Sequence, residues 1–357
     1  MKILYISPEN TVGVLGAWKE IHNSMGNYAR YITLYRGNNS YTEDICLDLP
    51  LVSTRRLYSN LREKFFRVYK KRRYDDEISG YPPTYISSGI IENFLYSIRD
   101  LVWQRRINKA IKAHNLFDFD IYHFEWGLDF FRDSRFAIEL KNRGKKIVCH
   151  YHGQDMRTRG VIKEMDGISD LNITNELDLL EKHPSINHIF LPFKLDMKTK
   201  KRKTRRLRVC HSPTNRTYKG TDEIILIIEK LKIEIEFDFI LIEGLSHKKA
   251  MEMKAGCDIF IDQITDLGGW GYGMSTIEAM SFGLCCICKM QPGVSESMNS
   301  PPIISADNDS LEHELRKLLN DRKKIADYGE KAYDWCNANH GYEAVSNQLY
   351  EYYNSIL

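Results

Sequence analysis

The stretch GGWGYGMSTIEAMSFG, residues 268–283, decides the fold class. Four glycines fall within its first six residues, and a helix-like segment follows them at once. The strand-like segment CDIFIDQI (257–264) precedes it and LCCICK (284–289) follows it. A strand, a loop, a helix and a second strand in this order predict a βαβ unit of a parallel sheet, with Gly283 ending the helix.

The glycine-rich loop has the composition of an anion-binding site. Ligands of open α/β sheets bind at the carboxyl ends of the strands, where glycines let backbone N–H groups approach and the helix dipole adds positive potential. A second interpretation stays open. Ser275 and Glu278 fit the S/T-x-x-E capping box, in which both side chains only satisfy the amides of their own helix.

A second loop of similar construction lies at residues 211–222, HSPTNRTYKGTD. It carries Arg216 and Lys219 in a loop between a strand and a helix that opens at Gly220 and Thr221. Two cations at this strand end complement an anion held by the glycine-rich loop. We therefore expect both loops to open on the same edge of one sheet.

The rest of the chain also alternates strands and helices. Strands are expected at 1–7, 119–126 and 145–153, and helices from about Trp18 to Ile32 and over 93–114, where Leu95, Ile98, Val102, Ile107 and Ile111 have helical spacing. The loop after the first strand contains Gly13 and Gly16. The pattern breaks in the Pro- and Lys-containing passage after residue 190. We therefore expect an α/β protein with two tandem Rossmann-like, doubly wound domains, covering 1–193 and 194–335, and a C-terminal helix at 336–357 that packs on the first domain.

Bulk composition agrees with a globular protein of about two domains. The chain has 357 residues, of which 43% are hydrophobic and 28% charged. No apolar run approaches the ~18 residues of a membrane span, and Pro8 interrupts the first apolar run too early for a signal peptide. We expect a cytoplasmic protein with its eight cysteines reduced and without a zinc site, because no second cysteine pair stands at metal-ligand spacing.

Two strongly basic segments have more than one interpretation. Residues 55–73 contain nine Lys or Arg and one acid, and residues 198–208 contain eight basic residues. The first segment has the pattern of a membrane-surface helix or of a helix that packs on the domain with its charges in water. Nucleic-acid binding is less favoured, because no recognised module accompanies the charges.

A histidine at the end of a predicted strand is a further candidate. His152 precedes Gly153 in CHYHGQD and shares a strand face with His150. A buried structural histidine and a functional one are both compatible with this position. The possible substrate-lining residues of this half are His123, Glu125, Asp155 and Arg157.

Together these motifs resemble one family. NRTYKGTD and GYGMSTIEAMSFG are similar to the donor-binding half of GT-B fold glycosyltransferases of the family 4 type, also called glycosyl transferases group 1. YHGQDMRTRG resembles the His-Gly-x-Asp segment of the first half. The resemblance implies an acceptor-binding first domain, a donor-binding second domain and an active site in the cleft between them. It also implies transfer from a UDP- or GDP-linked sugar with retention, and neither a metal nor another cofactor.

The resemblance also assigns roles to single residues. Glu278 holds the donor ribose, Arg216 and Lys219 neutralise the leaving diphosphate, and His152 lies near the transferred sugar. The remaining donor-binding residues are Gly16, Gly273, Met274, Ser275 and Thr276. Cations and amides aimed at the diphosphate supply electrostatic stabilisation, so no carboxylate pair is required.

This sequence departs from the family pattern at two places. Trp270, a possible substrate-lining residue, stands where many members have a second glutamate, and Arg216 and Lys219 are three residues apart rather than about five. The expected acceptor is a saccharide or a lipid-linked sugar of cell-surface polysaccharide or glycoconjugate synthesis. The rival functions are an epimerase or phosphorylase of the same fold and a non-catalytic protein that binds membrane or nucleic acid.

Overall fold

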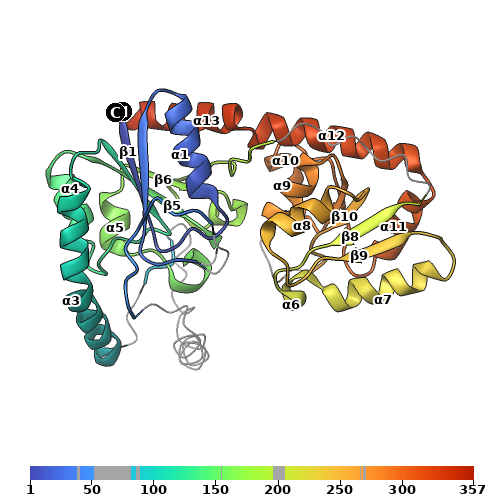
Figure 1. Ribbon diagram of the computed structural model, residues 1–357, viewed down its shortest axis with the longest axis horizontal. Helices are drawn as coiled ribbons and strands as arrows, with labels where there is room; N and C mark the ends of the chain where they lie inside the picture. The colour runs from blue at the N-terminus through green and yellow to red at the C-terminus, as the bar shows by residue number, and fades with distance from the viewer. Residues whose placement is uncertain are drawn as a thin grey trace. The chain divides into compact units, whose positions relative to one another are not determined.

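The computed structural model describes residues 1–37, 41–51, 82–85, 89–153, 155–195, 206–265, 267 and 271–357. The basic segment 55–73, most of 198–208, and Gly268, Gly269 and Trp270 lie outside the described residues. The chain forms two compact units, which are labelled by element in Figure 1. Unit 1 comprises Met1–Leu191 and Ser346–Leu357, and unit 2 comprises Pro192–Val345.

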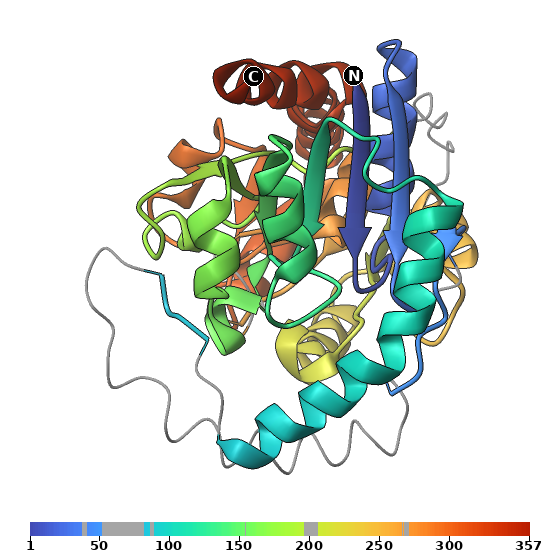
Figure 2. The same cartoon turned by 90° about the vertical axis from the view of Figure 1, so that its left-hand side faces the viewer.

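Unit 1 is built on a seven-stranded parallel sheet, seen in Figure 2, with the order β3-β2-β1-β4-β5-β6-β7. Its strands are β1 (Lys2–Ser7), β2 (Tyr28–Thr33), β3 (Ile45–Cys46), β4 (Ile121–Glu125), β5 (Lys146–Tyr151), β6 (Leu171–Thr174) and β7 (Ile186–His188). Almost every residue of β1, β4 and β5 is buried, as expected for a parallel sheet covered on both faces. The chain reverses direction across the sheet between β1 and β4, so the carboxyl ends of these strands are the expected ligand site of this unit.

The helices of unit 1 cover both faces of its sheet. α1 lies on one face and α4 and α5 on the other (Figure 1). The bounds are α1 (Val14–Ser24), α3 (Ile90–Ala113), α4 (Arg135–Asn142) and α5 (Lys163–Ile168), with a π-helical turn at Asp155–Arg159 and a 3₁₀ turn at Leu177–Leu179. The last helix, α13 (Tyr342–Ile356), belongs to unit 1 from Ser346 onward.

The predicted helix from Trp18 to Ile32 is wrong in its second half. α1 ends at Ser24, and Tyr28–Thr33 forms β2, paired in parallel with β1. Gly26 lies just past the helix with φ +75°, which is a common way for a helix to end. The segment that follows is rich in Tyr and Ile, and pairing with β1 decides its structure over the local helical spacing.

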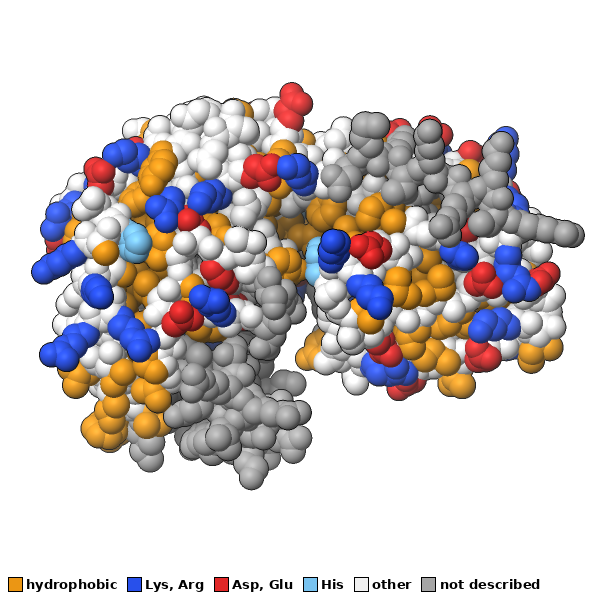
Figure 3. Space-filling view, in the orientation of Figure 1, with side chains coloured by type: hydrophobic (Ala, Val, Ile, Leu, Met, Phe, Trp, Pro, Cys, Tyr) orange, Lys and Arg blue, Asp and Glu red, His pale blue; other side chains and the backbone are white. Residues whose placement is uncertain are grey.

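The helix predicted at 93–114 is present as α3, but its apolar face differs from the expected one. Ile107 is fully buried, whereas Leu95, Ile98 and Val102 are 58%, 41% and 44% exposed. Trp103 is buried instead and donates its indole N–H to the carbonyl of Pro50 at 2.6 Å. In Figure 3 hydrophobic side chains gather at the lower left, over the region that α3 occupies in Figure 1.

Unit 2 contains a five-stranded parallel sheet with the order β12-β11-β10-β8-β9. Its strands are β8 (Arg208–His211), β9 (Asp238–Leu241), β10 (Ile259–Ile261), β11 (Cys285–Cys288) and β12 (Ile303–Ser305). Its helices are α6 (Arg216–Lys219), α7 (Thr221–Lys232), α8 (His247–Lys254), α9 (Met274–Ser281), α10 (Val294–Ser297), α11 (Leu311–Leu319) and α12 (Arg322–His340). α7 packs with α11, and α9 packs with α12 (Figure 1).

The strand order of unit 2 fixes where a ligand can bind. The chain runs from β8 to β9 at one edge and then returns to place β10 on the other side of β8. The reversal point therefore lies between β8 and β10, and ligands of doubly wound sheets bind at the carboxyl ends of such strands. Both loops singled out in the sequence leave the sheet at this point.

The eight cysteines are all described and all free, and Cys285, Cys286 and Cys288 are buried in β11. This agrees with their interpretation as small core residues. Among the described helices, none combines the length and the apolar character needed to cross a bilayer.

Candidate functional site

The loops after β8 and β10 touch each other directly in unit 2. Thr265 donates its hydroxyl to the carbonyl of Tyr218 at 2.6 Å, and the amide of Ile264 donates to the carbonyl of Lys219 at 3.3 Å. A side chain at Gly220, whose φ is +69°, would approach Ile264 to 2.6 Å. Glycine at this position therefore permits both the left-handed backbone and the close contact between the two loops.

The basic loop is more ordered than its sequence predicts. Arg216–Lys219 forms the single turn α6, and the Asn215 side chain caps it by accepting from the amide of Tyr218 at 3.1 Å. The turn ends at Gly220, where α7 begins. Arg216 and Lys219 consequently leave opposite ends of one helical turn and point to different partners.

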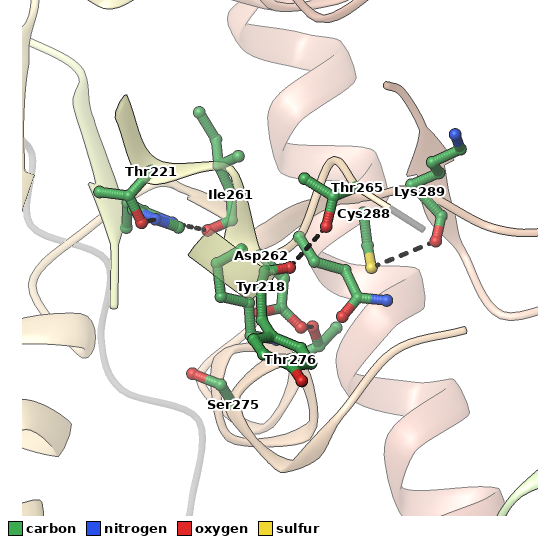
Figure 4. Close-up of polar contacts among 12 residues, drawn as sticks. Tyr218, Thr221, Ile261, Asp262, Thr265, Ser275, Thr276, Cys288 and Lys289 are labelled. Carbon is green, nitrogen blue, oxygen red and sulfur yellow. Dashed lines mark hydrogen bonds and ion pairs between the residues drawn. The ribbon is translucent and has the colours of Figure 1, made fainter. Parts of the chain in front are cut away.

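Lys219 belongs to a buried polar network that joins the two loops. Its ammonium donates to Oδ1 of Asp262 at 2.5 Å, and the hydroxyl of Thr276 donates to Oδ2 of the same carboxylate at 2.7 Å. Figure 4 shows Asp262 and Thr276 at this contact. Burial acts to raise the pKa of Asp262, but Lys219 and Thr276 outweigh it, so the pKa lies below its usual value. Asp262 is therefore an ionised anchor, 1% exposed, for two of the predicted donor-binding residues.

Arg216 has a different environment from Lys219. Its guanidinium is 44% exposed and forms ion pairs with Asp222 at 2.5 Å and with Glu243 at 2.8 Å. These carboxylates lie in the first turn of α7 and just after β9. The structure therefore holds Arg216 at the solvent-facing side of the β8 end, away from the Asp262 network.

The start of α9 excludes the capping-box interpretation. Gly273 is the N-cap residue and no side chain caps the helix, so Ser275 lies inside the first turn. The hydroxyl of Ser275 accepts from the ammonium of Lys254 at 2.8 Å, and the Glu278 carboxylate binds Lys254 and His247. The two side chains therefore serve contacts other than the capping of their own helix.

Three residues of this site were not predicted from the sequence. They are Asp262, His247 and Lys254. Asp262 carries a weak signal, because it is an aspartate directly after the apolar strand β10. Nothing in the spacing of α8 distinguishes buried Lys254 from the exposed Lys248 and Lys249.

In unit 1 a carboxylate and two histidines meet at the ends of β4 and β5. Oε2 of Glu125 lies 2.8 Å from Nε2 of His152 and 3.2 Å from Nδ1 of His150. Nδ1 of His152 lies 3.0 Å from the side-chain oxygen of Asn175. Both ring nitrogens of His152 thus face oxygen acceptors, which favours the doubly protonated, cationic ring.

The charges of this cluster reinforce one another. Burial acts to lower the pKa of His152, but the hydrogen bond and the charge of Glu125 outweigh it and raise the pKa to about 8. Burial likewise acts to raise the pKa of Glu125, whereas the two histidines bring it well below its usual value. Each of the three side chains offers one possible ligand atom, and these atoms lie within 4.8 Å of one another. Within the described residues this cluster therefore also has the geometry to hold a metal ion.

The other predicted residues of unit 1 lie in several environments. Asp155 is buried, accepts from the amide of His152 at 2.9 Å and so fixes the turn after β5. Arg157 is paired with Asp178 and Glu176. His123 is 1% exposed and lies 2.5 Å from the hydroxyl of Tyr353 in α13, so it belongs to the core.

Gly16 corrects a further expectation. The residue lies in the first turn of α1 rather than in the loop before it, because the helix begins at Val14 after Gly13, whose φ is +75°. A side chain built on Gly16 would have no neighbour among the described atoms within 4 Å. The space directly beside Gly16 is therefore open in the described part of unit 1.

The His152–Glu125 pair leads to a testable pH dependence. In the wild-type protein we expect the His152 ring to titrate near pH 8, so that it carries a charge at neutral pH. In Glu125→Gln the midpoint falls below the ordinary histidine value, because burial remains while the balancing carboxylate is lost. Histidine NMR titration measures both midpoints, with the exposed His114 as the internal control. A midpoint unchanged in Glu125→Gln would show that Glu125 does not hold the proton.

Comparison with known proteins identifies the family that the second half of the chain resembles. Residues 197–335 match the family model described as glycosyl transferases group 1. This match assigns residues 197–335 to the group 1 glycosyltransferases, and the chain as a whole is similar in fold to solved GT-B glycosyltransferases. The matched segment contains every residue of the unit 2 site described above, including Arg216, Lys219 and Glu278.

Solved structures extend the likeness of this glycosyltransferase to the whole chain. HepE of Anabaena in complex with UDP is 12% identical with a TM-score of 0.59, and the match covers 99% of this chain and 100% of that chain. Sucrose-phosphate synthase of Thermosynechococcus elongatus is 13% identical with a TM-score of 0.61, covering 99% and 98%. TarM of S. aureus is 12% identical with a TM-score of 0.61, again covering 99% and 98%. At these identities the likeness shows the fold, and a comparison with curated proteins gave no match.

Proposed function

We propose that this glycosyltransferase moves a sugar from a nucleoside-diphosphate sugar, with UDP as the favoured nucleotide, to a saccharide or lipid-linked acceptor. The observation that carries the proposal is the set of polar residues at the β8–β10 reversal point, inside the segment that matches group 1 glycosyltransferases. HepE has been solved with UDP and with UDP-glucose, and TarM with UDP and α-GlcNAc-glycerol. These complexes support a nucleotide-sugar donor and a saccharide acceptor for the present protein.

The environments of the unit 2 residues support the roles that we propose for them. Glu278 is ionised and offers a charged acceptor to the ribose hydroxyls. In this proposal the amides near Met274, Ser275 and Thr276 bind the diphosphate, which is supported by the lack of a side-chain cap on the first turn of α9. Lys219 and Arg216 supply positive charge at the neighbouring strand end. The place of His152 near the transferred sugar rests on the family resemblance and stays a prediction.

The chemistry assigned to this site is electrostatic. Negative charge gathers on the diphosphate as the bond to the sugar breaks, and fixed cations and amides stabilise that charge without further reorganisation. We propose that transfer proceeds with retention, without a metal ion, and in the synthesis of a cell-surface polysaccharide or glycoconjugate. In this proposal the side chains of the Glu125–His150–His152 cluster bind one another by hydrogen bonds and do not hold a metal ion.

A nucleotide screen tests the donor class. In thermal-shift measurements with EDTA present, we expect UDP to raise the melting temperature more than GDP or ADP, because a ligand that binds only the folded state stabilises it by mass action. Glu278→Gln provides the matched control, in which the UDP-dependent shift shrinks. Stabilisation that requires an added divalent ion would contradict the metal-free proposal, and no response to any nucleotide would contradict the donor assignment.

We further propose that the protein works in the cytoplasm and attaches peripherally to an anionic membrane. The basic segment 55–73 supports this idea, as do exposed apolar side chains on the first half of α3, where Phe94 and Leu101 are 64% and 72% exposed. Apolar contact combined with basic residues is the usual basis of such attachment.

Vesicle co-sedimentation tests the attachment. We expect binding to vesicles that contain phosphatidylglycerol, little binding to pure phosphatidylcholine, and release as salt rises above about 0.3 M, because surface charges are screened. Phe94→Ser with Leu101→Ser weakens binding, whereas Leu226→Ser in unit 2, equally exposed at 72%, leaves it unchanged. Binding that is independent of lipid charge would refute the proposal.

A further inference from the structure

Lys254 is an unusual residue for the last turn of a short surface helix. It is 1% exposed, and lysines are rarely buried to this degree unless they are paired. Its ammonium binds Oε2 of Glu278, lies 2.8 Å from the hydroxyl of Ser275 and lies 5.1 Å from the ring centre of Phe260 in β10. Helix α8 therefore delivers one buried cation to the first turns of α9.

The two oxygens of the Glu278 carboxylate have unequal surroundings. Oε2 faces the buried ammonium of Lys254, whereas Oε1 accepts from His247 at 2.7 Å. His247 is the first residue of α8, and its side chain is 43% exposed. Oε2 is thus held by the buried side chain of Lys254, which is packed inside unit 2. Oε1 is held by His247, which lies at the surface.

We infer that Lys254 is a positioning residue for the carboxylate of Glu278, and that His247 is a displaceable occupant of the oxygen that donor ribose takes. This inference rests on the proposed function, in which Glu278 holds the ribose. Breaking a buried pair leaves an uncompensated charge, so Lys254 keeps Glu278 ionised and in one orientation before the donor arrives. A ribose hydroxyl donates a hydrogen bond as the His247 ring does, so it can replace the ring at Oε1.

The pKa of Glu278 reflects the contacts of its carboxylate with both Lys254 and His247. Burial acts to raise it, while the hydrogen bond from His247 and the charge of Lys254 outweigh burial, so the pKa lies below its usual value. When His247 leaves, the carboxylate keeps its ion pair with the buried ammonium of Lys254. Donor binding then requires the displacement of one surface side chain and no reorganisation of the buried pair.

The ratio of the affinities for UDP and 2′-deoxy-UDP, measured by calorimetry, tests the inference. In the wild-type protein we expect UDP to bind at least tenfold tighter than 2′-deoxy-UDP, because one ribose hydroxyl is missing from the second ligand. In Lys254→Met the ratio falls to about threefold or less, and in Glu278→Gln it falls equally. The double variant is no worse than Glu278→Gln alone, because Lys254 acts through Glu278. Lys248→Met, an exposed change in the same helix, leaves the ratio unchanged.

His247→Ala supplies an independent test on an exposed side chain. It removes the occupant of Oε1, so we expect UDP to bind about three- to tenfold tighter than to the wild-type protein. Weaker or unchanged UDP binding in this variant would overturn the role of His247. If Glu278→Gln lowers the ratio of the affinities for UDP and 2′-deoxy-UDP but Lys254→Met does not, the role of Lys254 alone is overturned. A ratio unaffected by Glu278→Gln would instead remove the ribose role and with it the donor site proposed above.

Discussion

Replacing Arg216 by alanine is expected to lower turnover by about 10²-fold at saturating donor, with a much smaller loss of donor affinity. The guanidinium lies at the carboxyl end of β8 and is held by Asp222 and Glu243. These carboxylates balance its charge in the ground state. We expect the guanidinium to contribute most when additional negative charge develops on the leaving diphosphate, which is a contribution to the transition state.

The control for this prediction is another paired arginine. Arg316 in α11 is 33% exposed and binds Glu234 and Glu312, so Arg316→Ala removes a similar surface network. We expect wild-type kinetics in that variant. Steady-state kinetics with the preferred donor measure both changes. If Arg216→Ala loses affinity but keeps turnover, the site only binds an anion, and if it loses neither, Arg216 is an ordinary surface residue.

The second large effect is expected at Asp262. In Asp262→Asn the ammonium of Lys219, whose side chain is 15% exposed, loses its charged partner, and removing one member of a buried pair typically costs about 3–5 kcal/mol. We expect a loss of stability of about 3 kcal/mol, together with a loss of activity of at least about 10²-fold, because both Lys219 and Thr276 lose their anchor.

A double variant separates the two consequences. Adding Lys219→Met to Asp262→Asn removes the unpaired charge, and uncharged replacements of buried pairs are often close to neutral in stability. We therefore expect the double variant to recover most of the lost stability and to remain inactive, as measured by chemical unfolding and by donor turnover. Recovery of activity together with stability would contradict the role of Lys219 at the diphosphate.

Local sequence was sufficient for β1, β4, β5, β8, β10 and β11 and for the loops after β8 and β10, but it did not predict β3, β6, β7 or β12. β10 is a short apolar run and β8 a short, mostly buried strand, and the residues after them mark the two loops with glycines and cations. Helical spacing was misleading at residues 28–32, because pairing with β1 makes this segment a strand. On α3 the spacing was misleading about the buried face, because packing against the rest of the chain decides which side chains are covered. A helical pattern describes only the structure that a segment favours by itself. Pairing with a neighbouring strand contributes a stabilisation that this pattern does not contain.

The polar partners in the site are decided at a distance in sequence. Asp262 is 43 residues from Lys219, and Lys254 is 24 residues from Glu278. Each is a common charged residue whose meaning depends on burial and on one specific contact. The sequence predicted that Ser275 and Glu278 were either caps or ligand residues, and only the contact with Lys254 distinguished the two interpretations.

The most direct test of the account is to follow UDP-glucose, with GDP- and ADP-linked sugars beside it, in the presence of the protein and candidate saccharide acceptors. Proton NMR reports the released nucleoside diphosphate, the glycosylated product and the configuration of its anomeric carbon. We predict release of one nucleoside diphosphate per sugar transferred, with retained configuration, and loss of this release in Arg216→Ala and Glu278→Gln. An altered sugar still attached to its nucleotide would indicate an epimerase, and a strict requirement for inorganic phosphate would indicate a phosphorylase. Binding without release of any nucleoside diphosphate, with or without acceptor, would contradict the assignment of this protein as a sugar-transferring enzyme.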